Sequence, residues 1–493
     1  MIAAPPATSS LTTALPARRG VALPIILAGA AFFLLYARSL IAPVVFYDDF
    51  PILAQSWTWE GTRDGLWVPQ NEHTMPLGRL LTFGLECLAG RLSRLPIVTC
   101  LVGPLSLLLA LALIYVFVRR ETGHSFYALL ALVLFGVTTV YHQAVWWFAA
   151  SFAILALDTM LLGLLAAQRW RQTGRGIYLD LTFLACLLAP GWFAIGVLAG
   201  PLCFLYLLPP DEKPGPAFSA RHWSFLPLLG TALFLAVSLP LAAQTIMHLE
   251  HYGGQTAVDA FDPSIGLAYT ARSLVDNLLL GVVGVFGIAL PVWLVVPVLI
   301  GVLVLGTWWW RQARDRRLML LGLGLIGSSY LLVYSARSGW LYSQMVEPAF
   351  SRYHLLPHLG LVLFICGGLP GRAGRWFTPA EDASVSARQR RFVFALIGVC
   401  FLLQMPRGLI FGSPTGWQPF EAVRDQVPVL RRIEDVDARC RQHHISAAAA
   451  REALGKLDIP WSQGVLDGWQ FLRGSDDPRS MPREEIQRLL EAP

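Results

Sequence analysis

Residues 101–120 read LVGPLSLLLALALIYVFVRR, a run of eighteen uncharged and mostly apolar residues that ends in two arginines. About 20 apolar residues are needed for a helix to cross a bilayer, and arginines collect at the cytoplasmic end of such helices. The whole chain of 493 residues is 55% hydrophobic and only 14% charged, whereas a soluble domain carries about 25% charged residues. We therefore predict an all-α, multi-pass transmembrane helical bundle.

Apolar stretches of this kind recur along the chain, and they predict about 11 membrane spans, within a range of 10–13. The expected spans are residues 21–42, 96–118, 126–145, 148–167, 177–191, 193–208, 223–243, 291–310, 318–335, 354–369 and 392–411. Residues 270–290 are also apolar. We interpret them as an interfacial or re-entrant helix, because a second full crossing there would put the arginines of residues 311–317 on the outer side.

The distribution of basic residues predicts the orientation. Arg18 and Arg19 precede the first apolar segment, which has no convincing cleavage site, so a retained first span and a cytoplasmic N-terminus are expected. The segments assigned to the cytoplasm hold 18 Arg and Lys residues, and the assigned outer loops hold 7. We divide the chain into a cytoplasmic tail (1–20), a transmembrane domain (21–412) and a small, mostly helical, extracytoplasmic C-terminal region (413–493).

Composition and motifs exclude several classes of function. The net charge of +6 comes almost wholly from arginine, with Lys213 and Lys456 as the only lysines, so nucleic acid is not the expected partner. The seven cysteines contain no CxxC pair and lie mostly in apolar segments, which argues against a disulfide framework or a metal centre. The sequence also lacks the Walker A, GxSxG and HExxH motifs.

Three outer loops are longer than a connection requires: 43–95, 244–277 and 336–353. Long ordered loops usually carry function. The first of them opens with Asp48 and Asp49, set between the apolar sequences IAPVVF and PIL. A solvated turn would explain two aspartates. An apolar setting would instead raise the pKa of a carboxylate and make it a better general base.

The same loop continues with Glu72 and His73, followed by an amphipathic segment, residues 77–88, that is expected to lie along the membrane surface and carries Arg79. The third loop ends in Arg352 and Tyr353, and His354 begins the span that follows. A guanidinium at the outer interface is suited to bind phosphate oxygens in a bidentate manner. The alternatives are a hydrated loop for the first group and an arginine that snorkels to lipid headgroups for the second.

The predicted architecture resembles that of the C-type (GT-C) glycosyltransferases. It has a first span, a long outer loop that opens with an acidic pair, helices that lie on the membrane surface, about ten further spans and an outer tail. The likeness covers the architecture of residues 20–412. The resemblance implies a polyprenyl-phosphate sugar as donor, a glycan, lipid or protein of the cell envelope as acceptor, and a catalytic Asp in the first outer loop, here Asp48 or Asp49. It implies substrate-binding roles for Glu72, His73, Arg79, Arg352, Tyr353 and His354. The signature of the oligosaccharyltransferase branch is absent, so the acceptor and the use of a divalent cation stay open.

Two other classes compete with this interpretation. A transporter or flippase of lipid-linked saccharides would show internal repeats and polar residues at mid-membrane. No repeat is found, and apart from Asp158 the polar candidates cluster on the outer face. That aspartate could serve function or simply bond to a neighbouring helix. A non-catalytic envelope scaffold is the third class, in which the acidic pair binds a partner.

Overall fold

The computed structural model describes residues 19–41, 45, 49–70, 73–208, 224–248, 262–285, 288, 290–313, 315–343, 351–369, 385–410, 431 and 435. Within these ranges the chain is helical and forms no strand, apart from one isolated antiparallel bridge between Gln70 and His73. The prediction of an all-α protein is confirmed for this part of the chain. Outside it lie residues 1–18, residues 249–261 of the loop 244–277, nearly all of the C-terminal region, Asp48 and Glu72.

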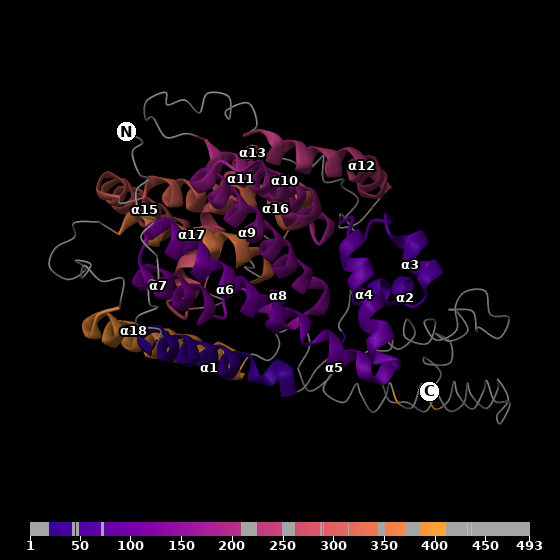
Figure 1. The fold of residues 1–493 in the computed structure, drawn as a ribbon, viewed down its shortest axis with the longest axis horizontal. Coiled ribbons are helices and arrows are strands. Elements are labelled where there is room, and N and C mark those ends of the chain that lie inside the picture. Colours follow the sequence, from indigo (N-terminus) through magenta and orange to yellow (C-terminus); the bar gives the residue numbers. More distant parts are fainter. Residues whose placement is uncertain are drawn as a thin grey trace, which may run out of the picture.

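The described residues form α-helices joined by short 3-10 turns and one π-helical stretch (Figure 1). In chain order these elements are α1 (Arg19–Ile41), α2 (Asp49–Ser56), α3 (Trp59–Gly65), α4 (Pro76–Ala89), η1 (Leu92–Arg94), α5 (Leu95–Thr99), α6 (Val102–Thr122), α7 (Ser125–Gly136), α8 (His142–Trp146), α9 (Phe148–Thr173), α10 (Gly176–Leu188), η2 (Ala189–Gly191), η3 (Ala194–Leu198), α11 (Ala199–Leu207), α12 (Leu226–His248), α13 (Pro263–Arg272), the π-helical η5 (Ser273–Leu279), α14 (Leu280–Val282), α15 (Val292–Gln312), α16 (Arg316–Ser343), η6 (Ser351–His354), α17 (Leu355–Gly368) and α18 (Ala387–Ile410).

Four helical stretches of the described chain are long and apolar enough to cross a membrane: Leu95–Thr122, Phe148–Thr173, Val292–Gln312 and Arg316–Ser335. Each coincides with a predicted span. Further apolar helices, among them α7, α10 and α11, are shorter than that length. The apolar helices associate the protein with a membrane, and the described residues support four crossings by length and composition.

Helix α9 lies at the centre of the bundle, where it packs against α6, α10 and α11 (Figure 1). Most of its residues are buried, whereas α15 leaves Trp293, Leu303 and other large apolar side chains exposed. Such an apolar exposed face is suited to contact with lipid tails. Helices α1 and α18 lie side by side along one edge of the bundle, and α2, α3 and α4 form a group at one end.

The predicted span 126–145 is interrupted in the structure, since α7 ends at Gly136 and α8 begins only at His142. The break contains the β-branched run Val137–Val140, which has a low preference for helix. Gln404 of α18 stabilises the open backbone there: its Oε1 accepts hydrogen bonds from the Thr139 N–H at 2.9 Å and from the Thr139 hydroxyl at 2.8 Å.

The predicted spans 177–191 and 193–208 form a short hairpin of α10 and α11, joined by the 3-10 turns η2 and η3. At a rise of about 1.5 Å per residue, α10 measures about 20 Å, less than the roughly 30 Å of a bilayer core. The first loop covers the hairpin tip. The Phe193 ring lies 4.1 Å from the His73 ring, and a β-carbon on Gly191 would come within 3.2 Å of Leu77.

Residues 270–290, interpreted above as interfacial or re-entrant, do not form one continuous α-helix. The stretch passes from α13 through the π-helical η5 into the short α14, and the chain turns at Gly284 with a φ of 80°. A positive φ of this size favours glycine. Asp276 of η5 forms an ion pair with Arg272 at 3.6 Å and accepts a hydrogen bond from the Leu290 N–H at 3.2 Å.

Candidate functional site

Asp49 caps the N-terminus of α9. The residue that precedes α9, Trp147, has extended backbone angles but makes no side-chain capping hydrogen bond. The carboxylate of Asp49 supplies one from a distant part of the chain, because its Oδ1 accepts a hydrogen bond from the Ala149 N–H at 2.7 Å. The free N–H groups and the dipole of a helix N-terminus stabilise a negative charge. Asp49 is fully buried, so this amide offsets part of the desolvation of its carboxylate.

Arg352, which belongs to the third long loop, contacts the same end of α9. Its guanidinium carbon lies 4.5 Å from the centre of the Trp147 ring and 5.0 Å from that of the Tyr353 ring. A guanidinium over an aromatic face gains about 0.5–2 kcal/mol. The backbone N–H of Arg352 donates to Oε1 of Gln143 in α8 at 3.3 Å. The turn η6 is therefore fixed to α8 and to the start of α9.

Two residues that the sequence singles out thus come together at one place. Asp49 binds Ala149, and Arg352 covers Trp147, so an acid of the first long loop and an arginine of the third converge on the N-terminal end of α9. Sequence spacing carries no information on this contact, because the two loops are separated by most of the bundle.

The neighbours of Arg352 contact α16 instead. His354 is buried, and its Nδ1 lies 3.0 Å from the hydroxyl of Tyr330, which is also 3.3 Å from the Ser273 carbonyl oxygen. Tyr353 packs against the small apolar cluster of Val333 and Tyr334. His73, by its contact with Phe193, lies at the tip of the α10–α11 hairpin.

Arg79 is fully buried on α4. Its Nη2 lies 3.4 Å from the Val68 carbonyl oxygen, and burial lowers the pKa of its guanidinium to about 10. No acidic side chain of the described residues pairs with it. Seven positions further, Glu86 is also buried, and burial raises the pKa of its carboxyl to about 9. Glu86 was not among the residues predicted from the sequence, although an acidic residue on the apolar face of an amphipathic helix could have indicated it.

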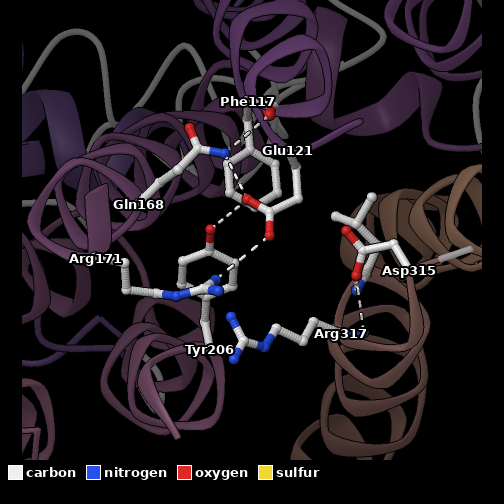
Figure 2. A network of polar contacts seen from close by, with 8 residues as sticks. Phe117, Glu121, Gln168, Arg171, Tyr206, Asp315 and Arg317 are labelled. Atoms are coloured by element: carbon white, nitrogen blue, oxygen red, sulfur yellow. Dashed lines mark hydrogen bonds and ion pairs between the residues drawn. The ribbon is translucent and has the colours of Figure 1, made fainter. Parts of the chain in front are cut away.

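A second polar cluster lies at the opposite end of α9 (Figure 2). There Gln168 donates to Glu121 at 2.7 Å and to the Phe117 carbonyl oxygen at 3.2 Å, and the hydroxyl of Tyr206 also donates to Glu121. Arg171 forms an ion pair with Glu121 at 3.4 Å and stacks over the Tyr206 ring. This network ties together α6, α9 and α11.

The two clusters mark the ends of a membrane-length helix. Ala149 and Arg171 are separated along α9 by about 33 Å at 1.5 Å per residue, close to the thickness of a bilayer core. Between them Asp158 is 3% exposed, and neither of its carboxylate oxygens has a hydrogen-bond partner among the residues that the structure describes. It is the buried acid at mid-helix that the sequence identified.

Asp48 and Glu72 lie outside the described residues. Among the residues that are described, no three His, Cys, Asp or Glu side chains come together in a group that could hold a metal ion. In comparisons with known proteins, no family model, no curated protein and no solved structure matches this chain.

Proposed function

We propose that this protein is a membrane glycosyltransferase of the GT-C type, which moves a sugar from a polyprenyl-phosphate donor to an acceptor of the cell envelope. The observation that carries the proposal is the convergence of Asp49 and Arg352 on the N-terminus of α9. A lipid-linked sugar keeps its tail in the bilayer and its phosphate at the surface. An enzyme for it needs a cation and a carboxylate together at the end of a membrane helix.

In this proposal the end of α9 that carries Asp49 faces outward, and the end that carries Arg171 faces the cytoplasm. Arginines gather at the second end, where α6 and α9 finish: Arg119, Arg120, Arg169, Arg171 and Arg175. This bias follows the positive-inside rule. The full topology of about 11 spans, with a cytoplasmic N-terminus and an extracytoplasmic C-terminus, belongs to the same proposal.

The proposed reaction needs one base and one cation. Asp48 removes the proton of an acceptor hydroxyl, whose oxygen attacks the anomeric carbon of the donor sugar. The bond from that carbon to the phosphate oxygen breaks, and the phosphate leaves with the electron pair. Arg352 stabilises its charge. Asp49 serves as a positioning residue, because its Oδ1 is engaged by the amide of Ala149.

The remaining candidates have supporting places around this reaction. Tyr353 positions Arg352, since its hydroxyl lies 3.4 Å from the guanidinium Nη2, and His354 fixes the same turn to α16 through Tyr330. His73 contacts Phe193 at the tip of the α10–α11 hairpin, where we place the donor sugar, and Glu72 precedes it in the sequence. A divalent cation is compatible with the acidic pair but is not required.

The test is transfer of label from a radiolabelled polyprenyl-phosphate sugar to membrane acceptors at matched protein levels. Asp48→Asn keeps the shape of the side chain and is expected to reduce transfer by about 10²–10⁴, as loss of a general base does. Glu60→Gln, a change of an exposed acid in the same loop, is the matched control and should transfer normally. Full transfer by Asp48→Asn would contradict the assigned base and leave Glu72 as the next acid to test.

Asp158 is the observation that favours a transporter, because a buried acid at mid-membrane is typical of ion and substrate pathways. The two classes differ in what Asp158→Asn does. A transporter would lose movement of lipid-linked saccharide across vesicles with Asp158→Asn, and no donor would be consumed. The glycosyltransferase would consume donor in both the wild type and this variant.

A further inference from the structure

The buried face of α4 holds an arginine and a glutamate at positions 79 and 86. Seven residues of α-helix correspond to about 10 Å along the axis and bring two side chains back to the same face within about 20°. Arg79 is fully buried and Glu86 is 4% exposed. Both side chains therefore lie on one buried face of α4, in line along the helix, and Arg79 reaches the segment that follows α3.

Among the described residues, neither side chain finds partners for all of its polar atoms. Over the described ranges, Nε and Nη1 of Arg79 and both carboxylate oxygens of Glu86 make no hydrogen bond. The remaining contact of Arg79, from Nη2 to the Val68 carbonyl oxygen, is long at 3.4 Å. With a pKa of about 10 the guanidinium stays charged at neutral pH, and with a pKa of about 9 the carboxyl of Glu86 stays protonated.

Helix α2 and the residue before Met75, which precedes α4, hold further buried polar atoms that have no hydrogen-bond partner among the described residues. They are Oε1 of Gln55, Oγ of Ser56 and Oγ1 of Thr74. Helix α2, which carries the first two, packs against α4. The end of α3 lies between Gln55 and Arg79. Gly65 lies against Gln55, and its carbonyl oxygen accepts a hydrogen bond from the N–H of Val68, whose own carbonyl oxygen contacts Arg79.

Buried polar atoms are normally paired, and a concentration of unpaired ones needs an explanation such as a ligand or ordered water. One buried cation calls for an oxyanion, which the planar guanidinium binds with two parallel hydrogen bonds. The other unpaired groups are a protonated carboxyl, two hydroxyls and an amide carbonyl. They pair best with groups that both donate and accept hydrogen bonds. Hydroxyls of a saccharide have this property.

We propose that the α2–α4 group binds an anionic saccharide, with its phosphate or carboxylate at Arg79 and its hydroxyls at Glu86. Within the glycosyltransferase proposal, on which this step rests, that ligand is the acceptor, so the acceptor is a charged glycan. The contact of α4 with α9 differs from the contact of Arg352. Gly78 lies against Phe152, whereas Arg352 covers Trp147, and five positions correspond to about 140° around α9.

The test is thermal unfolding of the full-length protein in detergent with four probes: glucose 6-phosphate, glucuronate, inorganic phosphate and glucose. The wild type should be stabilised most by the two charged sugars. Arg79→Met should raise the unfolding temperature without ligand, because it removes an unpaired buried charge, and weaken the charged-sugar affinity about tenfold or more. Arg91→Met, at an exposed arginine beyond the end of α4, is the matched control and should change neither quantity.

Glu86→Leu should abolish the advantage of glucose 6-phosphate over inorganic phosphate while the phosphate response persists. Arg79→Lys keeps the charge without the fork and provides a second variant if Arg79→Met does not fold; it too should weaken the charged sugars. A lower unfolding temperature in both Arg79 variants with unchanged ligand shifts would overturn the site. Equal responses to phosphate and glucose 6-phosphate would overturn the saccharide part.

A shift produced only by vesicles of phosphatidylglycerol, and by none of the soluble probes, would assign Arg79 to a lipid headgroup and overturn the proposal. These binding measurements use no sugar donor. A positive result therefore stands even if no transfer is found, and a negative result leaves the transfer assay of Asp48→Asn unaffected.

Discussion

The carboxylate of Asp49 accepts a hydrogen bond from the backbone N–H of Ala149 at 2.7 Å, across 100 positions of sequence. This bond joins the start of the first long loop to the first turn of the central helix. Because Trp147, beside that turn, also carries the guanidinium of Arg352, one end of α9 organises two loops that the chain keeps far apart.

Asp49→Ala should lower the free energy of unfolding by about 1–3 kcal/mol, because it leaves the buried N–H of Ala149 without an acceptor. Asp49→Asn should lower it less, since the amide oxygen can still accept the bond. Thermal or denaturant unfolding in detergent measures both. Asp64→Ala, at an exposed acid of α3, should change stability by less than about 0.5 kcal/mol. Equal stability of Asp49→Ala and Asp64→Ala would show that the cap contributes nothing.

Trp147→Leu should weaken donor binding by about 2–30-fold, because the leucine removes the aromatic face that holds the Arg352 guanidinium. The expected signature is a raised apparent KM for the polyprenyl-phosphate sugar with a smaller change in kcat. Trp293→Leu serves as the control, since this tryptophan of α15 is 71% exposed and lies far along the chain from the site. The idea fails if both tryptophan variants show the same donor dependence.

Glu86 should make stability depend on pH. Burial raises the pKa of its carboxyl from 4.5 to about 9, so between these values the folded protein keeps a proton that the unfolded chain releases. Stability should therefore fall as pH rises from about 5 to 9, with a slope of up to about 1.4 kcal/mol per pH unit. Unfolding of the wild type and of Glu86→Gln over pH 5.5–8.5 measures the difference.

The glutamine variant should lack this component of the slope, because its side chain does not titrate. Glu60→Gln, at an exposed acid, should retain it. Parallel pH profiles of the wild type and Glu86→Gln would mean that the carboxyl of Glu86 ionises normally in the folded protein.

The ends of α9 should lie on opposite sides of the membrane. In a background that carries Cys87→Ser and Cys440→Ser, a membrane-impermeant thiol reagent should label Asp64→Cys in intact cells but should label Arg175→Cys only after lysis. Both positions are exposed in the structure, so a difference in labelling reports on the side of the membrane. Labelling of Arg175→Cys alone in intact cells would reverse the proposed orientation. Labelling of both variants in intact cells would show that the two ends do not lie on opposite sides.

The amphipathic helix of the first loop was predictable in position: residues 77–88 were expected, and α4 covers Pro76–Ala89. The environment of Arg79 was not. The resemblance gave it a substrate-binding role, and the structure shows it buried without an ion pair among the described residues. The partner of Asp49 was not predictable either, because it is a backbone amide, and backbone amides leave no signal in residue identity.

The sequence by itself determined that the protein is helical and associated with a membrane, because apolar runs such as 101–118 must form helices to satisfy their backbone in lipid. Those properties follow from local composition. Tertiary structure decided that residues 177–208 form a short hairpin, that Val137–Val140 break a predicted span, and that Asp49 and Arg352 meet at α9. These features depend on contacts between segments distant in sequence, and the packing of helices against one another alone selects which distant side chains become neighbours.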